Sequence, residues 1–427
     1  MNIRHVNEQL SFSDALTPAA FQCLHQAGYA LVVNHRPDEE GGEYLTHREE
    51  RALAEQYGIA YVSLPFTYES LTWEQVYAFN RCVCSGKKLL AHCRTGSRSV
   101  GVFFLHALNE GLLDDAGFRE QCRLYGADAE AALAWYCRQQ QHTPVAQVHS
   151  FYEPISGSLQ YVIADSESRH CAIIDPVLDF NRNTGAVTHE QAQRLLDFIQ
   201  QKQWQVSWIL DTHPHADHFS AAAWLAQQTG APMAIGENII EVQGFWKSVY
   251  HLPTLATPDS IWNVLFKDGE VFYVGNLRGD VMFSPGHTPA SVTYHLGNCA
   301  FIHDTLFMPD SGTARTDFPG GSSAALWESV QSLLRLPADT RLFTGHDYCP
   351  NGREVRYEST IQEQRDNNPF LILEDKAGFI AMRTQRDETL PLPELMLMAI
   401  QVNINGGRLP EPERDGHRYL KIPLNRF

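Results

Sequence analysis

Short apolar runs alternate with longer amphipathic stretches over the first quarter of the chain. The apolar runs YALVV, IAYVSLPF and KKLLAHC have the length of buried strands, and the stretches LTWEQVYAFNRC and VGVFFLHALNEG carry apolar residues at helical spacing. Strands that alternate with helices in this way indicate a sheet covered by helices. The pattern predicts a compact α/β domain over residues 1–113.

The pattern then becomes mostly helical before strands return. Residues 115–141 are rich in Ala, Glu, Arg and Gln, carry apolar residues at helical spacing and are followed by Pro144. We therefore expect a helical connector over residues 114–145. A second domain over residues 146–373 opens with the strand-like runs LQYVIAD and HCAIIDPV, and residues 374–427 are expected to form a C-terminal appendage packed on it.

Residue types that bind metals recur at one kind of place in the second domain. The runs SWILDTH, VMFSPGH, CAFIHD and RLFTGHD each place His or Asp directly after a short apolar stretch. Loops at one end of a sheet lie close together, so we expect these side chains to share one edge of the fold. They are His213, His287, Asp304 and His346, and His213 begins an H-x-H-x-D-H motif that continues with His215, Asp217 and His218.

This set of side chains predicts a metal centre. Imidazole and carboxylate groups that converge from separate elements suit zinc, iron or manganese. A single buried histidine is more often a hydrogen-bonded core residue, but that explanation does not extend to the whole set. The residue types leave the identity of the metal open.

Charge and cysteine content narrow the function classes. The chain of 427 residues has 33 basic and 50 acidic residues and a formal net charge of −17, so it would repel a nucleic acid. The first residues lack the apolar core of a signal peptide, and no apolar run is long enough for a bilayer, so we expect a cytoplasmic protein without a membrane partner. The nine cysteines are scattered, which predicts neither a disulfide framework nor a zinc knuckle.

Around the metal motif the chain resembles the metallo-β-lactamase superfamily, whose fold is an αββα sandwich with metals at one sheet edge. The segments IIDPV, SPGHTP, ARTDF and GHDY are most similar to those of the persulfide dioxygenases. Glyoxalase II, a thioester hydrolase with the same histidine motif, lacks the ARTDF-type segment. The resemblance covers residues 147–373 and favours the persulfide branch. One departure is His303, which stands where the family usually has glycine and which we expect to point into the sheet.

The resemblance implies one Fe(II) per chain, held by His213, His287 and Asp304. Two histidines and one carboxylate leave open positions for O2 and a sulfur substrate. The other residues of the motif orient ligands or waters in this interpretation, whereas in the hydrolase interpretation they complete a site for two zinc ions; they are His215, Asp217, His218 and His346. Both interpretations use the same residues, so the sequence does not choose between them.

The co-substrate that the resemblance implies is glutathione persulfide, an anionic derivative of a tripeptide. An acidic protein needs local positive charge to hold it. Arg315 of ARTDF and Tyr348 of GHDY are the main candidates for substrate binding, with Arg365 as a weaker one. The alternative role for Arg315 is a structural ion pair with Asp317 or Asp310.

Cys93 lies in the loop CRTGSRS, between an apolar run and a helix expected to begin near Ser99. The backbone N–H groups of such a turn, the helix N-terminus and the nearby arginines stabilise a thiolate, which predicts a reactive cysteine. Four residues separate Cys93 from Arg98, whereas cysteine phosphatases have five there. The shorter loop resembles that of the rhodanese-type sulfurtransferases, with Cys93 and Arg98 as the predicted catalytic residues.

The remainder of the first domain, including NHRPDEE at residues 34–40, resembles a small phosphatase-like family with the dual-specificity-phosphatase fold. The loop decides the predicted chemistry, because function resides in the site rather than in the fold. Together the two halves resemble the β-lactamase hydrolase-like proteins, which fuse such a domain to a persulfide dioxygenase.

This resemblance implies a bifunctional enzyme of sulfide detoxification. At iron, glutathione persulfide and O2 would give glutathione and sulfite, and a persulfide on Cys93 would move sulfane sulfur to or from sulfite and thiosulfate. The alternatives are a two-zinc thioester hydrolase fused to a cysteine phosphatase, and a first domain that is a non-catalytic interaction module. The sequence leaves a homo-oligomer open.

Overall fold

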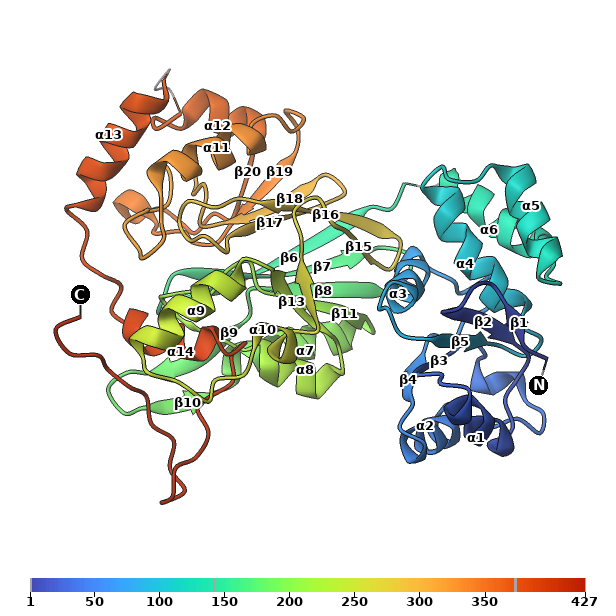
Figure 1. The fold of residues 1–427 in the computed structure, drawn as a ribbon. Helices are drawn as coiled ribbons and strands as arrows, with labels where there is room; N and C mark the ends of the chain where they lie inside the picture. The colour runs from blue at the N-terminus through green and yellow to red at the C-terminus, as the bar shows by residue number, and fades with distance from the viewer. Residues whose placement is uncertain (1, 142, 372–374, 427) are drawn as a thin grey trace. The chain divides into compact units, whose positions relative to one another are not determined.

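The computed structural model describes residues 2–141, 143–371 and 375–426. The chain divides into two compact units, Met1–Thr143 and Pro144–Phe427. Each unit has its own sheets and its own helices (Figure 1). Within the described residues, no helix has both the length and the apolar character needed to cross a bilayer.

The first unit is built on a mostly parallel sheet with the strand order β1-β2-β5-β3-β4. The central strand β5 pairs in parallel with β2 and β3, and β1 pairs antiparallel with β2. Strands β2, β3 and β5 are buried along their whole length, which explains their nearly continuous apolar runs. The strands are β1 (Arg4–His5), β2 (Leu10–Ser13), β3 (Leu31–Asn34), β4 (Ala60–Ser63) and β5 (Leu89–His92).

Helices cover both faces of this sheet (Figure 1). Phe21 and Leu24 of α1 pack with Val32 and Leu90 of the sheet in one apolar cluster, which α2 extends with Ala54. The helices are α1 (Pro18–Gln26), α2 (His47–Gln56), α3 (Trp73–Val83), α4 (Ser97–Asn109), α5 (Asp115–Leu124) and α6 (Glu130–Gln140).

The segment expected to be a connector forms α5 and α6, and both helices pack within the first unit. The Trp135 side chain of α6 is buried, and its indole N–H donates to the Leu71 carbonyl at 2.9 Å. Its ring also packs on Trp73, with ring centroids 4.7 Å apart. A buried tryptophan of this kind makes the segment part of the core of the first unit rather than a linker.

The second unit has the predicted αββα architecture, with two sheets face to face and helices on both outer sides (Figure 1). The inner faces meet in an apolar core that includes Tyr161 and Trp208 from one sheet and Phe272 and Phe301 from the other. The first sheet contains, in spatial order, β14 (Val264–Phe266), β13 (Met233–Gly236), β11 (Gln205–Leu210), β8 (His170–Ile174), β7 (Ser158–Asp165) and β6 (Ala146–Glu153). The second contains β15 (Val271–Val274), β16 (Leu277–Phe283), β17 (Val292–Leu296), β18 (Cys299–His303), β19 (Arg341–Thr344) and β20 (Glu358–Thr360).

The outer helices and a small third sheet complete this unit. Apolar residues of α7, α8 and α9 pack on the first sheet, and those of α11, α12 and α13 pack on the second. The small sheet contains β10 (Ala186–Thr188), β9 (Val177–Asn181) and β12 (Phe219–Ser220). The helices are α7 (Glu190–Lys202), α8 (Ala222–Thr229), α9 (Ile239–Val249), α10 (Pro258–Ile261), α11 (Ser323–Leu333), α12 (Ile361–Asn367) and α13 (Lys376–Asp387).

The C-terminal segment, expected to be an appendage, forms part of the core of the second unit. Helix α14 (Met396–Asn403) contributes Met396, Ile400 and Val402 to the same apolar cluster as α8 and α9. The Gln243 side chain of α9 donates to the carbonyl of Ile404 at 2.9 Å. The second unit therefore depends on the C-terminal segment for its packing.

Candidate functional site

His213 lies in the loop after β11, and a buried carboxylate fixes this loop. Thr212 donates to Asp175 from its backbone N at 2.7 Å and from its hydroxyl at 2.8 Å. Asp175 follows β8, the parallel neighbour of β11, and its φ of 50° lies in the left-handed region that Asp tolerates better than most residues. The Asp175 side chain thus fixes the backbone of the loop after β11, and this positions His213.

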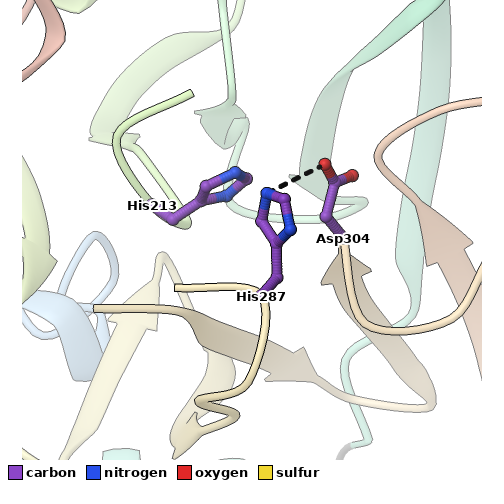
Figure 2. Close-up of side chains that lie close together, drawn as sticks. All are labelled: His213, His287 and Asp304. Carbon is purple, nitrogen blue, oxygen red and sulfur yellow. Dashed lines mark ion pairs between the residues drawn. The ribbon is translucent and has the colours of Figure 1, made fainter. Parts of the chain in front are cut away.

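His287 and Asp304 come from the second sheet and meet His213 at one edge of the sandwich, as Figure 2 shows. His287 lies in the loop after β16, and Asp304 directly follows β18. One ligand atom from each of the three side chains lies within 4.8 Å of the other two. His287 Nε2 and Asp304 Oδ2 are 3.6 Å apart. The structure therefore brings together the three residues that the resemblance implies as iron ligands.

These three side chains fit a metal ion. Among the described residues, His213 Nε2 and Asp304 Oδ1 are buried without a hydrogen-bond partner, a cost that a bound cation would remove. His287 Nδ1 lies 2.8 Å from the carbonyl oxygen of Arg315, to which it can only donate, and this leaves Nε2 as the ligand atom. Burial and the neighbouring imidazoles hold the pKa of His213 well below its usual value, so its ring is neutral, the form that binds metals.

A second set of candidate ligands borders the first. His215, Asp217 and His346 also place one ligand atom each within 4.8 Å of one another. His346 Nε2 lies 3.5 Å from both Asp217 Oδ2 and Asp304 Oδ1, so the two sets adjoin. His218 is not part of this set, and its Nδ1 lies 3.0 Å from the carbonyl oxygen of Phe219.

His215 has a close partner other than a metal. Its Nε2 lies 3.0 Å from Asp175 Oδ1, the same carboxylate that holds Thr212. Burial opposes protonation of His215, but the charges of Asp175, Asp217 and Asp304 outweigh it and raise its pKa to about 9. His215 thus links the metal motif to the buried carboxylate that fixes the loop.

His303, which is expected to point into the sheet, is buried and lies beside His213. The centroids of the two rings are 4.8 Å apart, and His303 Nδ1 accepts a hydrogen bond from the backbone N of Asp304. The φ of His303 is 36°, in the left-handed region that favours glycine, which gives a physical reason for a glycine at this position in relatives. Burial lowers its pKa to about 3, so the neutral ring packs against the ligands without repelling a cation.

A cavity of about 430 Å³ opens onto both ligand sets. Arg315 and Tyr348 line it, but Nε and Nη2 of Arg315 each donate to Asp317 at 2.7 Å, which is the structural ion pair weighed against substrate binding. Arg365 does not line this cavity. Its guanidinium donates to the carbonyl of Leu334, at the C-terminus of α11, where helix carbonyls lack intrahelical partners. The structure thus places Arg365 against α11 and outside the lining of this cavity.

Sequence reasoning missed the contribution of the C-terminal helices to the site. Asn403 of α14 is buried, and its side-chain amide donates to the carbonyls of His215 and His218, both at 2.7 Å. Its side-chain oxygen accepts from the backbone N of Ser220 at 2.7 Å. Arg383 and Arg386 of α13 line the cavity. An asparagine in a short helix gives no local signal for such a role, because its partners lie far away in the sequence.

In the first unit, Cys93 directly follows β5 and its side chain is buried, 1% exposed. The backbone N–H of Gly96 donates to Cys93 Sγ at 3.1 Å. Gly96 has a φ of 87°, and a Cβ there would meet the Arg4 guanidinium, so the turn needs glycine. Arg4 in turn donates to the carbonyl of Thr95 at 2.9 Å, which holds the loop from outside. One backbone N–H of the turn thus contacts the sulfur, and Cys93 as a reactive cysteine stays a prediction.

Arg98, the second predicted catalytic residue, has a side chain that contacts two groups of the first unit. Its guanidinium donates to the carbonyl of Phe66 at 2.8 Å and forms an ion pair with Glu40, with an Nη2 to Oε2 distance of 2.8 Å. Next to the cysteine, His92 Nε2 lies 3.1 Å from the buried carboxylate of Glu50. These contacts hold Arg98 and the strand end that carries Cys93 in place.

Comparison with known proteins agrees with the division into two units. Residues 2–109 match the phosphatase-like domain of the β-lactamase hydrolase-like proteins, and residues 156–346 match the metallo-β-lactamase superfamily. A β-lactamase hydrolase-like protein of Xylella fastidiosa (strain Temecula1) is 48% identical over 426 residues, which cover 100% of this chain and 98% of that protein.

More distant similarity links the second unit to proteins of known chemistry. The mitochondrial persulfide dioxygenase ETHE1 of Bos taurus is 29% identical over 277 residues, covering 63% of this chain and 93% of that protein. The crystal structure of ETHE1 from Myxococcus xanthus matches with a TM-score of 0.50 at 28% identity, and it covers 61% of this chain and 100% of that chain.

Proposed function

The chain belongs to the β-lactamase hydrolase-like proteins, with a phosphatase-like domain fused to a metallo-β-lactamase fold, and from this premise we propose a bifunctional enzyme of persulfide metabolism. The metal centre oxidises glutathione persulfide with O2, and the cysteine loop transfers sulfane sulfur. The observation that carries the first activity is the His213, His287 and Asp304 set beside a cavity, in a fold similar to ETHE1.

In the proposed oxidation, one persulfide, one O2 and one water react to give one thiol and one sulfite. The S–S bond breaks, the sulfane sulfur loses four electrons and O2 gains them, and the thiol keeps the other sulfur. A bound Fe(II) supplies the one-electron chemistry with O2 that zinc lacks. One Fe(II) would be held by Nε2 of His213 and His287 and a carboxylate oxygen of Asp304.

The residues around these ligands orient them and bind the substrate. The Arg315 carbonyl fixes the tautomer of His287, and Asp175 fixes the loop of His213 through Thr212. The 3.0 Å distance between His215 Nε2 and Asp175 Oδ1 is consistent with a role of His215 in orienting the loop in this proposal. The lining of the cavity is mixed, with apolar walls and arginines, which suits an anionic thiol derivative.

For the cysteine loop the proposed reaction is sulfur transfer. The Cys93 thiolate attacks the outer sulfur of thiosulfate, the S–S bond breaks, and sulfite leaves with the electron pair. Glutathione thiolate then removes the sulfur from Cys93, which regenerates the thiolate and produces glutathione persulfide. The N–H of Gly96 at 3.1 Å from Sγ stabilises the thiolate that leaves in the second step.

A second candidate function rests on the neighbouring ligand set. His215, Asp217 and His346 are close enough together to hold a second metal ion, and two zinc ions would activate a water for thioester hydrolysis. The matching alternatives for the first unit are phosphatase chemistry at Cys93 and a non-catalytic interaction module.

The experiment is metal reconstitution of the metal-free protein, followed by two assays. We expect Fe(II) to restore oxygen uptake with glutathione persulfide, together with sulfite formation, and zinc to restore neither. Zinc-dependent hydrolysis of glutathione thioesters without oxygen uptake in the iron form would instead favour the hydrolase.

A further inference from the structure

Three arginines line the cavity at the metal centre, and they differ in their partners. Arg315 pairs with Asp317 through two contacts of 2.7 Å. Arg383 is buried and pairs with Asp387, with an Nε to Oδ1 distance of 3.0 Å. Both guanidinium groups are therefore neutralised by carboxylates of the protein itself.

Arg386 is the third, and its guanidinium is exposed on the last turn of α13. Among residues 2–141, 143–371 and 375–426, no carboxylate forms an ion pair with it. Its guanidinium carbon lies 5.3 Å from the centroid of the Phe370 ring, a cation–π contact that leaves the N–H donors available. Arg386 thus offers the cavity a positive charge that the described part of the chain does not neutralise.

The position of Arg386 relative to the metal centre is fixed by hydrogen bonds of α13. Asp387 accepts from the backbone N of Thr316 at 2.8 Å and from its hydroxyl at 2.9 Å, and Arg383 donates to the carbonyl of Thr313 at 3.0 Å. The same segment contains Arg315, whose carbonyl orients His287. A ligand held by Arg386 would therefore have a fixed position relative to the proposed iron ligands.

The cavity is lined by carboxylates of the proposed metal-binding residues and, on α13, by the positive charge of Arg386. This distribution suits a substrate with a reacting sulfur at one end and a carboxylate at the other. Asp217 and Asp304 lie among the proposed metal-binding residues, so a substrate carboxylate gains nothing there, whereas the reacting sulfur belongs at the metal. The lining of the cavity also includes the apolar side chains of Phe307, Phe318 and Leu390.

We infer that Arg386 binds a carboxylate of the thiol that carries the persulfide, away from the reacting sulfur. This inference rests on the proposed function and assigns Arg386 as the residue that selects thiols with a carboxylate, through an N⁺–H···O⁻ pair from α13. The persulfide of a neutral thiol would lack this contact.

The test compares ligands with and without carboxylates on the metal-loaded full-length protein. Binding of glutathione and of its diethyl ester is measured by calorimetry for the unaltered chain, for Arg386→Gln and for Arg335→Gln. Arg335 is a matched surface arginine that pairs with Ser332 and lies outside the cavity lining. We expect Arg386→Gln to weaken glutathione binding about 10-fold and to leave diester binding unchanged.

Steady-state oxygen uptake provides the second readout. For Arg386→Gln, KM for glutathione persulfide should rise by about the same 10-fold, while KM for the persulfide of 2-mercaptoethanol stays constant. Equal losses for both ligand types, or no loss in Arg386→Gln, would overturn the inference. If no variant consumes oxygen but the carboxylate still controls binding, the proposed oxidation fails and the binding site stands.

Discussion

At the scale of single residues, the metal centre is marked by buried polar atoms that lack a protein partner. His213 Nε2 and Asp304 Oδ1 are two such atoms, and they lie in the same ligand set. Leaving a buried donor or acceptor unpaired costs about 1–3 kcal/mol, so their coincidence calls for a ligand that is not part of the chain. The left-handed backbone at His303 adds a local strain next to these atoms.

Replacement of Asp304 tests this set directly. Asp304→Ala removes its single carboxylate, so we expect the iron content of the purified protein to fall by at least about 10-fold and persulfide-dependent oxygen uptake to be lost. Asp339→Ala, which changes an exposed carboxylate of the same unit, is the control. Wild-type iron content in Asp304→Ala would show that the ligand assignment is wrong.

The sequence located the candidate metal-binding residues more reliably than their surroundings. His213, His287, Asp304 and His346 could be grouped because each lies within a few residues of the end of an apolar run, a pattern that depends on local sequence, whereas the choice of three iron ligands among them is what the family resemblance implies. The orientation of the His303 side chain could not be predicted from the sequence, since it depends on a positive φ that histidine rarely adopts. The contact of Arg365 with the Leu334 carbonyl could not be predicted either, because its charge is visible in the sequence but its partner is not.

At the scale of elements, helix α14 completes the loop that carries the H-x-H-x-D-H motif. The Asn403 side chain donates to two carbonyls of the motif and accepts from the N–H of Ser220. All three hydrogen bonds are 2.7 Å long and buried. Residues that position metal ligands in this way commonly change metal affinity about 10- to 100-fold when they are replaced. Metal binding and packing of the C-terminal segment are therefore coupled.

Asn403→Asp is the sharpest test of this coupling. The change keeps the shape of the side chain but replaces the two donors with an oxygen that faces carbonyl oxygens. We expect iron affinity, measured by competition with a chelator, to fall about 10- to 100-fold. Asn405→Asp, on the same segment at a side chain that donates to the carbonyl of Arg408, should bind iron as the unaltered chain does. Equal affinity in both variants would contradict the coupling.

The alternation of strands and helices predicted most elements of both units, because periodicity records which face is buried. It did not predict that α5, α6 and α14 belong to cores. Trp135 and Ile400 are apolar residues at helical spacing in either case, and only their tertiary partners distinguish a core helix from a connector or an appendage.

At the scale of the whole molecule, two units with separate cores carry the two proposed activities. Cys93 lies in the unit Met1–Thr143 and the proposed iron ligands lie in the unit Pro144–Phe427. The apolar clusters of the two units share no residue. The product of the proposed transfer, a glutathione persulfide, is the substrate of the proposed oxidation.

Cys93→Ser separates the two activities. Serine keeps the size of the side chain, but its hydroxyl does not ionise near neutral pH and cannot carry a persulfide. Thiosulfate:thiol sulfurtransferase activity should vanish, while iron content and persulfide-dependent oxygen uptake stay within about twofold of the unaltered protein, because Cys93 and the proposed iron ligands belong to separate compact units with no shared partners among the described residues. Cys137→Ser, at an exposed cysteine of the same unit, is the control. Rapid Cys93-dependent hydrolysis of aryl phosphates, with no persulfide on Cys93 by mass spectrometry, would support a phosphatase instead.

We propose that the second unit holds a mononuclear iron site for sulfur oxidation, and metal analysis of protein purified without added metal tests this proposal most directly. We expect about one iron per chain, bound by two imidazoles and one carboxylate, and oxygen uptake with glutathione persulfide in proportion to that iron. Two zinc ions per chain, with oxygen uptake absent at every iron content, would contradict it.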